Sequence, residues 1–415
     1  MVLNLVWLGF FVAAFATACV RLAQGDLDVF GRLLAALFEA AKTGFDISLG
    51  LAGVMALWLG ILKVGERAGM VDALARTAAP LLRRLFPGVP AGHPAQGAMT
   101  MNFSANLLGL DNAATPLGLQ AMRALETLNP RPGTATDAQI LFMVLNTAGV
   151  TLIPTSVIAI RQSIALRQGV QNFNAADIFL PTLLATLASC LAGLLAVAVW
   201  QRLPLWKPRL LLPLAAVVAA VLATMAGLAR LPPETAARVA GLAGAGCIFT
   251  LVVAFLAAGA WRRVPVYEAF VDGAKEGFGV AVQIVPYLVG MLAAIAVFRA
   301  AGCMDAVMAA LAAAVRGLGL DTAFLPALPV GLMKILSGAG ARGLMVDVLQ
   351  THGVASFAGR LAAIIQGSTE TTFYVLAVYC GSVGLKHTRH ALACALIADG
   401  AGIVAAIAIA YAFFR

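Results

Sequence analysis

The sequence predicts an all-α polytopic membrane protein, and three observations support this fold class. Hydrophobic residues make up 61% of the chain and charged residues only 11%. The mean hydropathy of +0.94 is far from that of a soluble domain. A helix needs ~20 apolar residues to cross the hydrocarbon core of a bilayer. Charge-free stretches of that length occur at residues 1–20, 139–160, 178–201, 210–229, 239–261 and 277–298.

Charged residues separate the expected elements along the chain. Residues 1–20 lack the basic start and the cleavage pattern of a signal peptide, so we interpret them as a retained span. Segments 66–86 and 303–317 carry basic residues beside helically spaced apolar residues, which is typical of helices at the membrane surface. The expected spans lie near 1–20, 46–64, 139–160, 178–201, 210–229, 239–261, 277–298, 361–385 and 391–414.

Segments 95–122 and 322–346 are short or interrupted by Pro, Gly and polar residues. We expect discontinuous or re-entrant helices there, because non-helical backbone is tolerated in a membrane only where protein or water satisfies it. In particular, we predict that 97–118 and 333–346 do not cross as unbroken helices. The breaks are expected at Gly109, Pro116, Gly338 and Gly340.

Composition also limits the partners and the chemistry. The net charge of +9 fits the excess of basic residues in cytoplasmic loops, and no basic run is interleaved with aromatic residues, so no nucleic acid is expected.

The six cysteines stand in apolar context without a C-x-x-C pair, and His387 and His390 lie beside the positively charged Lys386 and Arg389, which disfavours a bound metal. We therefore expect no metal, no cofactor and no catalytic residue. A nucleotide-binding loop of the G-x-x-x-x-G-K-[ST] type is also absent from the sequence.

An internal repeat appears at an offset of 233 residues. Residues 41–73 and 274–306 align without a gap and share ten identical pairs, including Ala-Lys-x-Gly-Phe and Ala-Gly-x-x-Asp-Ala. We interpret the chain as two related halves, 1–200 (the first half) and 265–415 (the second half). The hydrophobic linker 201–264 joins them and is expected to form a helical hairpin at 209–261.

Polar side chains gather in the later part of each half. In the first half, Asn102 and Asn106 share one face of a helix because they are four residues apart. In the second half, Glu370 is the only charged residue between Arg360 and Lys386. Intramembrane carboxylates are expensive and are functional candidates by default. The candidate solute-binding residues are Asn102, Ser104, Asn106, Asp111, Asn112, Thr115, Asn146, Thr147, Thr151, Ser337, Gln366, Ser368, Thr369, Glu370 and Thr372.

Each group also has a purely structural interpretation. The asparagines could join helices without binding anything. Glu370 could be a buried carboxylate satisfied by neighbouring hydroxyls or by Lys42, Lys63 or Lys275. Pro154 lacks an amide hydrogen, so it predicts either a simple kink or exposed backbone near a solute.

The chain resembles the spore maturation protein A and B family, which belongs to the nucleoside-recognition, or Gate, group. The first half resembles protein A in MALWLGILKVGERAG (55–69), in 93–118 and in NTAGVTLIPTSVIAIR (146–161). The second half resembles protein B in VYEAFVDGAKEGF (266–278), LSGAGARGLMVDVL (336–349) and QGSTETTFYVLAVYCGSVGLKHTRHAL (366–392). Related domains occur in concentrative nucleoside transporters and in bacterial ferrous-iron transporters. The resemblance implies two Gate-type halves, for which an inverted repeat is favoured, in a multi-pass protein of the bacterial inner membrane.

These observations together predict a transporter or channel-like protein for a small polar solute, driven by an ion gradient. Glu370 is the leading candidate for coupling to a proton or cation, and the two polar groups are expected to face each other around one cavity. The partners expected are the lipid bilayer, the solute, the coupling ion and a second copy in a homo-oligomer. The alternatives are a non-transporting scaffold of envelope or spore-maturation machinery and, less favoured, an intramembrane enzyme.

Overall fold

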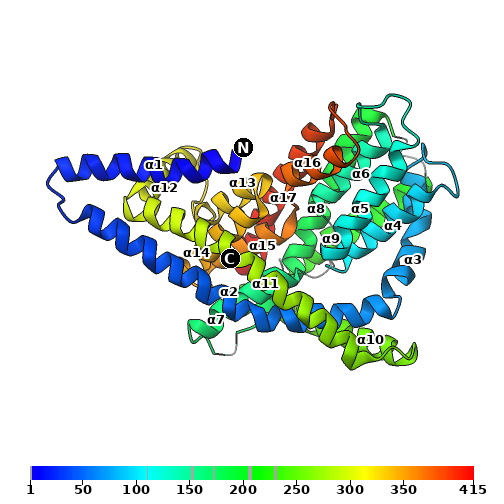
Figure 1. Cartoon of the computed structure of the whole chain (residues 1–415), viewed down its shortest axis with the longest axis horizontal. Helices are drawn as coiled ribbons and strands as arrows, with labels where there is room; N and C mark the ends of the chain where they lie inside the picture. The colour runs from blue at the N-terminus through cyan, green and yellow to red at the C-terminus, as the bar shows by residue number, and fades with distance from the viewer. Residues whose placement is uncertain are drawn as a thin grey trace.

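A computed structural model describes residues 2–109, 111–149, 151, 154–171, 173–203, 208–228, 230 and 232–415. The described chain is almost entirely helical (Figure 1). Seven of its helical segments are long and apolar enough to cross a membrane: Asn4–Ala23, Val29–Arg67, Ala175–Gln201, Arg238–Trp261, Val266–Ala300, Phe357–Ser382 and Ala391–Phe414. The sequence-based prediction of an all-α, multi-pass membrane protein is confirmed.

The helices of the first half are α1 (Val2–Ala23), α2 (Val29–Arg67), α3 (Met70–Leu85), α4 (Pro94–Leu107), α5 (Asp111–Glu126), α6 (Asp137–Ala148), α7 (Thr155–Arg167), the 3₁₀ turn η1 (Ala175–Ile178) and α8 (Phe179–Gln201). The linker contains α9 (Pro208–Leu228) and α10 (Pro233–Trp261). The second half contains α11 (Val266–Ala300), α12 (Cys303–Gly317), η2 (Leu325–Ala327), α13 (Leu328–Leu336), α14 (Gly338–His352), α15 (Phe357–Ser368), α16 (Thr372–Ser382) and α17 (Ala391–Phe414).

The internal repeat is visible at the ends of α2 and α11. α2 ends at Arg67 and α11 at Ala300, which are equivalent at the offset of 233 residues. The next glycines, Gly69 and Gly302, adopt left-handed φ angles of 74° and 87°. An L-residue with a side chain is strained there, so glycine allows the tight turn into α3 and α12. The two segments therefore share the helix–turn–helix that the aligned residues predict.

Close backbone contacts show how α2 and α11 cross. A Cβ on Gly44 would lie 3.0 Å from the backbone of Val289, and one on Gly277 would lie 2.4 Å from the carbonyl oxygen of Met55 and 2.7 Å from Cα of Ala56. Gly277 is the repeat equivalent of Gly44, and Val289 is that of Ala56. The contact is thus reciprocal, as at a twofold axis. Later residues of α2 meet earlier residues of α11, so the related helices are antiparallel, as in an inverted repeat.

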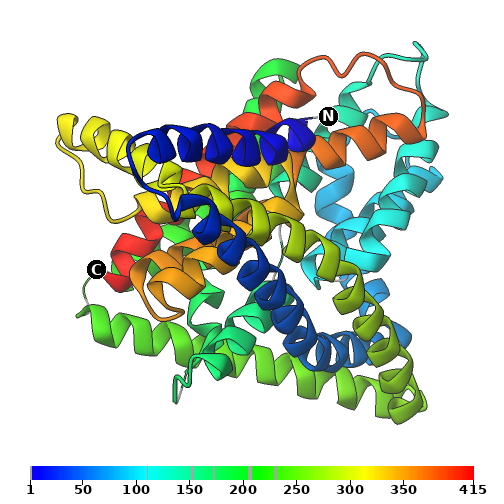
Figure 2. The same cartoon turned by 60° about the vertical axis from the view of Figure 1, so that its left-hand side comes forward.

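The same relation holds for α8 and α17. A Cβ on Gly193 would lie 3.1 Å from Ala398, and one on Gly402 would lie 3.1 Å from Ser189, so these helices are also antiparallel neighbours. Figures 1 and 2 show α2 and α11 as two long helices side by side, with α1 and α12 at one end of the molecule and α3 to α6 at the other. The exact limits of the halves remain a prediction.

Two expected spans differ from the structure. Residues 139–160 are divided between α6 and α7, because Gly149 ends α6 with a φ of 48° and Pro154 has no amide hydrogen with which to continue a helix. Residues 361–385 are divided between α15 and α16 at Thr369–Thr371. Length and the absence of charge do not distinguish these paired half-helices from single spans.

Candidate functional site

Four of the short breaks between consecutive helices concern the candidate site. The break between α4 and α5 contains Gly109, whose φ is 73°. The break between α13 and α14 is Ser337 alone, which has extended backbone angles of −156° and 116°. Its Oγ accepts a 3.0 Å hydrogen bond from the amide of Gly340, so the serine both interrupts the chain of helical hydrogen bonds and caps α14. The other two breaks separate α6 from α7 and α15 from α16.

The prediction that 97–118 and 333–346 are broken is confirmed, but some of the expected breaking residues were wrong. Pro116 lies inside α5, where a proline can remove one hydrogen bond without ending the helix. Gly338 is the first residue of α14 and Gly340 lies within it, because Ser337 has already made the break. Only Gly109 lies where the sequence indicates.

A polar cavity lies where the four pairs of half-helices meet. Its volume is about 70 Å³. A buried water needs roughly 10–15 Å³ by such a measure, so the cavity has room for about five waters. Residues from both halves line it: Gly109, Thr151, Pro154, Thr155, Ser156, Val157, Lys334, Arg342, Gln366, Gly367, Thr369 and Glu370.

Four of the predicted site residues therefore share this cavity, namely Thr151, Gln366, Thr369 and Glu370. Glu370 lies in the break between α15 and α16, and its amide donates a 2.8 Å hydrogen bond to the carbonyl oxygen of Thr147 in the first half. Its side chain packs against Gly149, where a Cβ would lie 2.8 Å from Cγ. The basic residues considered as partners lie elsewhere: Lys63 pairs with Glu66 and Glu276, and Lys275 lies nearest Asp272.

The asparagines of the first half form a separate hydrogen-bond network. Nδ2 of Asn106 donates to Oδ1 of Asn146 at 2.9 Å, and the same oxygen accepts a 3.2 Å bond from the Tyr379 hydroxyl. Nδ2 of Asn102 donates to the carbonyl oxygen of Ala114 at 2.8 Å. These residues thus join α4, α5 and α6 to α16, the role expected of asparagines that hold helices together in a membrane.

Two of the remaining predicted site residues are bonded within their own helices. The Thr147 hydroxyl donates to the carbonyl oxygen of Val144, and the Ser368 hydroxyl donates to that of Ile365. Ser104 borders a different, apolar cavity of about 300 Å³ together with Asn106. Thr115 is half-buried on α5, and the side chains of Asp111 and Asn112 lie outside the described residues.

Three charged residues were missed in the sequence: Lys334 and Arg342, which line the cavity, and Asp399, which interacts with Lys334. Lys334 is only 6% exposed, and Asp399 in α17 is completely buried. Oδ2 of Asp399 accepts a 2.7 Å hydrogen bond from the hydroxyl of Thr372, a predicted site residue, and its charge interacts with that of Lys334. A signal existed: Asp399 is the only charge within the apolar run 391–414, by the same criterion that identified Glu370.

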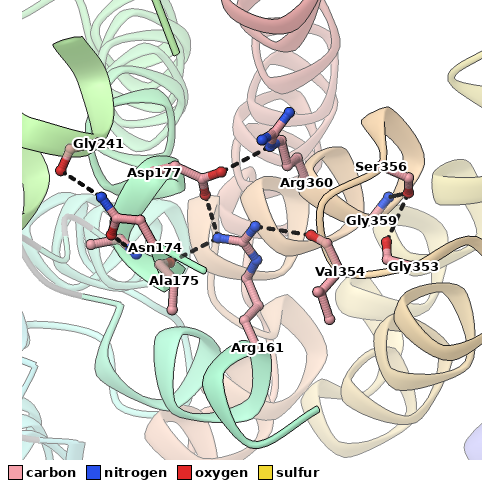
Figure 3. A network of polar contacts seen from close by, with 11 residues as sticks. Arg161, Asn174, Ala175, Asp177, Gly241, Gly353, Val354, Ser356, Gly359 and Arg360 are labelled. Carbon is pink, nitrogen blue, oxygen red and sulfur yellow. Dashed lines mark hydrogen bonds and ion pairs between the residues drawn. The ribbon is translucent and has the colours of Figure 1, made fainter. Parts of the chain in front are cut away.

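Two sets of contacts join the halves at opposite ends of the molecule. We call the first the buried clasp; it consists of Arg161, Asp177, Val354 and Arg360 (Figure 3). Arg161 is fully buried and donates to a carboxylate oxygen of Asp177 and, at 3.0 Å, to the carbonyl oxygen of Val354. Arg360 donates to the second oxygen of Asp177 at 2.8 Å. One carboxylate thus connects two arginines from different halves.

The exposed clasp consists of Gly133, Ala135, Asp137, His387 and Arg389. The amide of Ala135 donates to the carbonyl oxygen of His387 at 2.9 Å, and the amide of His387 donates to that of Gly133 at 3.0 Å. Arg389 forms an ion pair with Asp137 at 2.7 Å, and both side chains are substantially exposed to solvent.

The two clasps are equivalent under the repeat. In the exposed clasp, the segment before α6 contacts the loop between α16 and α17. In the buried clasp, Val354 in the segment before α15 contacts Arg161 of α7 and Gln168 just after α7. Arg360 of α15 contacts Asp177 between α7 and α8. Figure 1 shows α6 and α16, which flank the exposed clasp, on one side of the bundle and α7, which flanks the buried clasp, on the other. The polar cavity borders the start of α7 and the end of α15, and both helices extend from it to the buried clasp.

This arrangement defines a class: a polytopic α-helical membrane protein whose antiparallel repeats place broken helices around a polar cavity. Comparison with known proteins identifies the family within this class. The family model Gate, described as nucleoside recognition, matches residues 48–163 and 281–386, and the chain belongs to that family.

Two relatives come from Bacillus subtilis (strain 168). The chain is 44% identical to spore maturation protein B over 164 residues, which cover 40% of this chain and 90% of that protein. It is 36% identical to spore maturation protein A over 192 residues, which cover 46% of this chain and 92% of that protein. The resemblance to both proteins is confirmed. No solved structure matches the chain.

Proposed function

We propose that this protein is a transporter or channel-like protein of the bacterial inner membrane that moves a small polar solute. The observation that carries the proposal is the polar cavity between the halves, which is lined by residues of three helix breaks and by Lys334 and Arg342 on either side of the fourth. Broken helices at membrane depth need partners for their free backbone groups, and transporters commonly use such breaks to bind solute between repeats. A scaffold would need no such cavity.

The two clasps support an alternating mechanism. Equivalent contacts close the bundle at its two ends, so opening one clasp while the other stays closed would give the cavity access to one side at a time. The two clasps differ in strength. The ion pair of Asp137 and Arg389 is exposed and contributes at most about 1 kcal/mol, whereas separating the fully buried Arg161 from its partner costs about 3–5 kcal/mol. We expect the exposed clasp to open first.

Two carboxylates support coupling to a proton or another cation. Glu370 lines the cavity, and Asp399 lies behind it on α17 with one oxygen, Oδ1, that has no hydrogen-bond partner among the described residues. A carboxylate in a low-dielectric site is stabilised when a proton or cation neutralises it. Glu370 touches the cavity directly, so we assign the coupling step to it and a supporting role to Asp399.

Flux into vesicles containing the purified protein tests the proposal. Radiolabelled uridine, glycine, acetate and phosphate serve as probes under an imposed proton or sodium gradient, with protein-free vesicles as the blank. For the probe that enters, Glu370→Gln should abolish gradient-driven uptake while the melting temperature stays near that of the unmodified protein, because glutamine keeps the size and the hydrogen-bonding groups.

The matched control is Glu39→Gln, which changes an exposed carboxylate of α2. It should leave uptake unchanged. Unchanged uptake in Glu370→Gln would remove this residue from the mechanism. Absence of uptake for every probe and gradient would favour the scaffold interpretation.

A further inference from the structure

The cavity presents more positive than negative side-chain charge. Lys334 and Arg342 line it together with one carboxylate, that of Glu370. Lys334 is only 6% exposed, and it forms no direct ion pair with an acidic side chain in the described part of the chain, although its charge interacts with that of the buried Asp399. Its position in the last turn of α13 gives it some stabilisation from the helix dipole. Desolvation of a buried ion is costly, so an anion in the cavity would add to the stabilisation that Asp399 and the helix dipole give Lys334.

The N-terminus of α7 also faces the cavity. Thr155, Ser156 and Val157 are its first three residues and all border the cavity. Their amides precede the first helical hydrogen bond, which Ile158 donates to the carbonyl oxygen of Pro154. Pro154, as the N-cap residue, supplies no side-chain acceptor. Amides at a helix N-terminus carry partial positive charge and bind anions.

A third group lacks a partner in the same place. Gln366 lines the cavity and is 5% exposed, and its Oε1 is buried without a hydrogen bond to any described residue. A buried polar atom that lacks a hydrogen-bond partner destabilises the fold, so a ligand that pairs with this amide would be favoured. The oxygen accepts hydrogen bonds and is satisfied only by a ligand with a polar hydrogen, whereas a half-turn of the amide presents its NH₂ group, which donates to an anion.

We propose that the cavity binds a small anion, either a carboxylate or a tetrahedral oxyanion, between Lys334, Arg342 and the N-terminus of α7. This inference rests on the proposed function in that it names the class of solute. The volume of about 70 Å³ limits the ligand to a few heavy atoms in this conformation. A nucleoside is much larger than the five or so waters that would fill this space. Glu370, the carboxylate that lines the cavity, accepts the accompanying proton or cation.

Binding to the full chain in lipid nanodiscs tests the proposal without requiring transport. Acetate and acetamide are compared by calorimetry, since they have nearly the same shape and differ in charge, and phosphate is measured separately. Acetate, phosphate or both should bind, and acetamide should not. Lys334→Met, which keeps the length and burial of the side chain, should weaken anion binding by about tenfold or more, because charge-assisted hydrogen bonds are the strong ones. Lys275→Met, at a side chain that is 75% exposed, should leave binding unchanged.

The outcomes separate this inference from the proposed function. Equal binding of acetate and acetamide, or no binding of either anion, overturns the anion site, and this comparison needs only the unmodified protein. Anion binding without flux in vesicles supports the site and removes the proposed transport. Uptake of an uncharged probe without anion binding preserves transport and rejects the anion. Phosphate binding without acetate binding assigns the site to oxyanions, and the reverse result assigns it to carboxylates.

Discussion

Substitution of Gly277 by alanine should destabilise the protein, because α2 and α11 touch backbone to backbone at that residue. The added Cβ would lie 2.4 Å from the carbonyl oxygen of Met55 and 2.7 Å from Cα of Ala56. Neither atom can move by a side-chain rotation, so the helices must separate. Overpacking of this kind typically costs about 1–3 kcal/mol. An opposing gain arises because alanine favours a helix over glycine by about 1 kcal/mol.

Gly279→Ala provides the matched control, since Gly279 lies in the same helix and a Cβ there would meet nothing within 4 Å. The helix-propensity gain is common to both variants and cancels in their difference. Gly277→Ala should therefore be less stable than Gly279→Ala by about 1–3 kcal/mol. Unfolding in mixed detergent micelles, followed by circular dichroism, measures this difference. Equal stability of the two variants would refute the antiparallel contact between α2 and α11.

Two further predictions concern the contacts that join the halves. Asp177→Asn should lower the free energy of unfolding by about 3–5 kcal/mol, because the fully buried Arg161 would lose its counter-charge. Asp137→Asn in the exposed clasp should lower it by about 1 kcal/mol or less. Comparable losses for the two variants in detergent unfolding would contradict the difference between the clasps. Tyr379→Phe should cost about 0.5–1.5 kcal/mol, because Asn146 keeps its bond from Asn106 and Asn102 keeps its bond to Ala114 when the hydroxyl is removed. A larger loss would show that this tyrosine holds the network together.

The sequence predicts much of the fold for physical reasons that are local. Charge-free runs predict spans, and the shared residues of 41–73 and 274–306 predict the repeated helix–turn–helix. Ser337 is a different case. It breaks a helix because its side chain caps the next one, and a serine between leucine and glycine does not by itself indicate this.

The candidate site could be predicted only in part. Glu370 and Gln366 are visible because polar residues are unusual in a span. The asparagines give an equally strong signal, yet Asn106 and Asn146 bond to each other and not to the cavity. Whether a polar side chain meets a neighbour or a cavity depends on the crossing of distant helices, which no local pattern contains. Lys334 illustrates the same limit, since its burial results from packing between α13 and the other half-helices.

The central claim is that the cavity between the broken helices belongs to a water-accessible solute pathway, and cysteine labelling tests this most directly. Both variants are made in a protein from which the six native cysteines have been removed. Ser156→Cys places a thiol at the cavity. Ser189→Cys, the control, places a thiol in the contact between α8 and α17, where the serine donates to the carbonyl oxygen of Ala398. Both changes are nearly isosteric. A membrane-impermeant methanethiosulfonate reagent should modify Cys at position 156 and not at position 189. An unreactive thiol at 156, or equal reaction at both positions, would contradict the account.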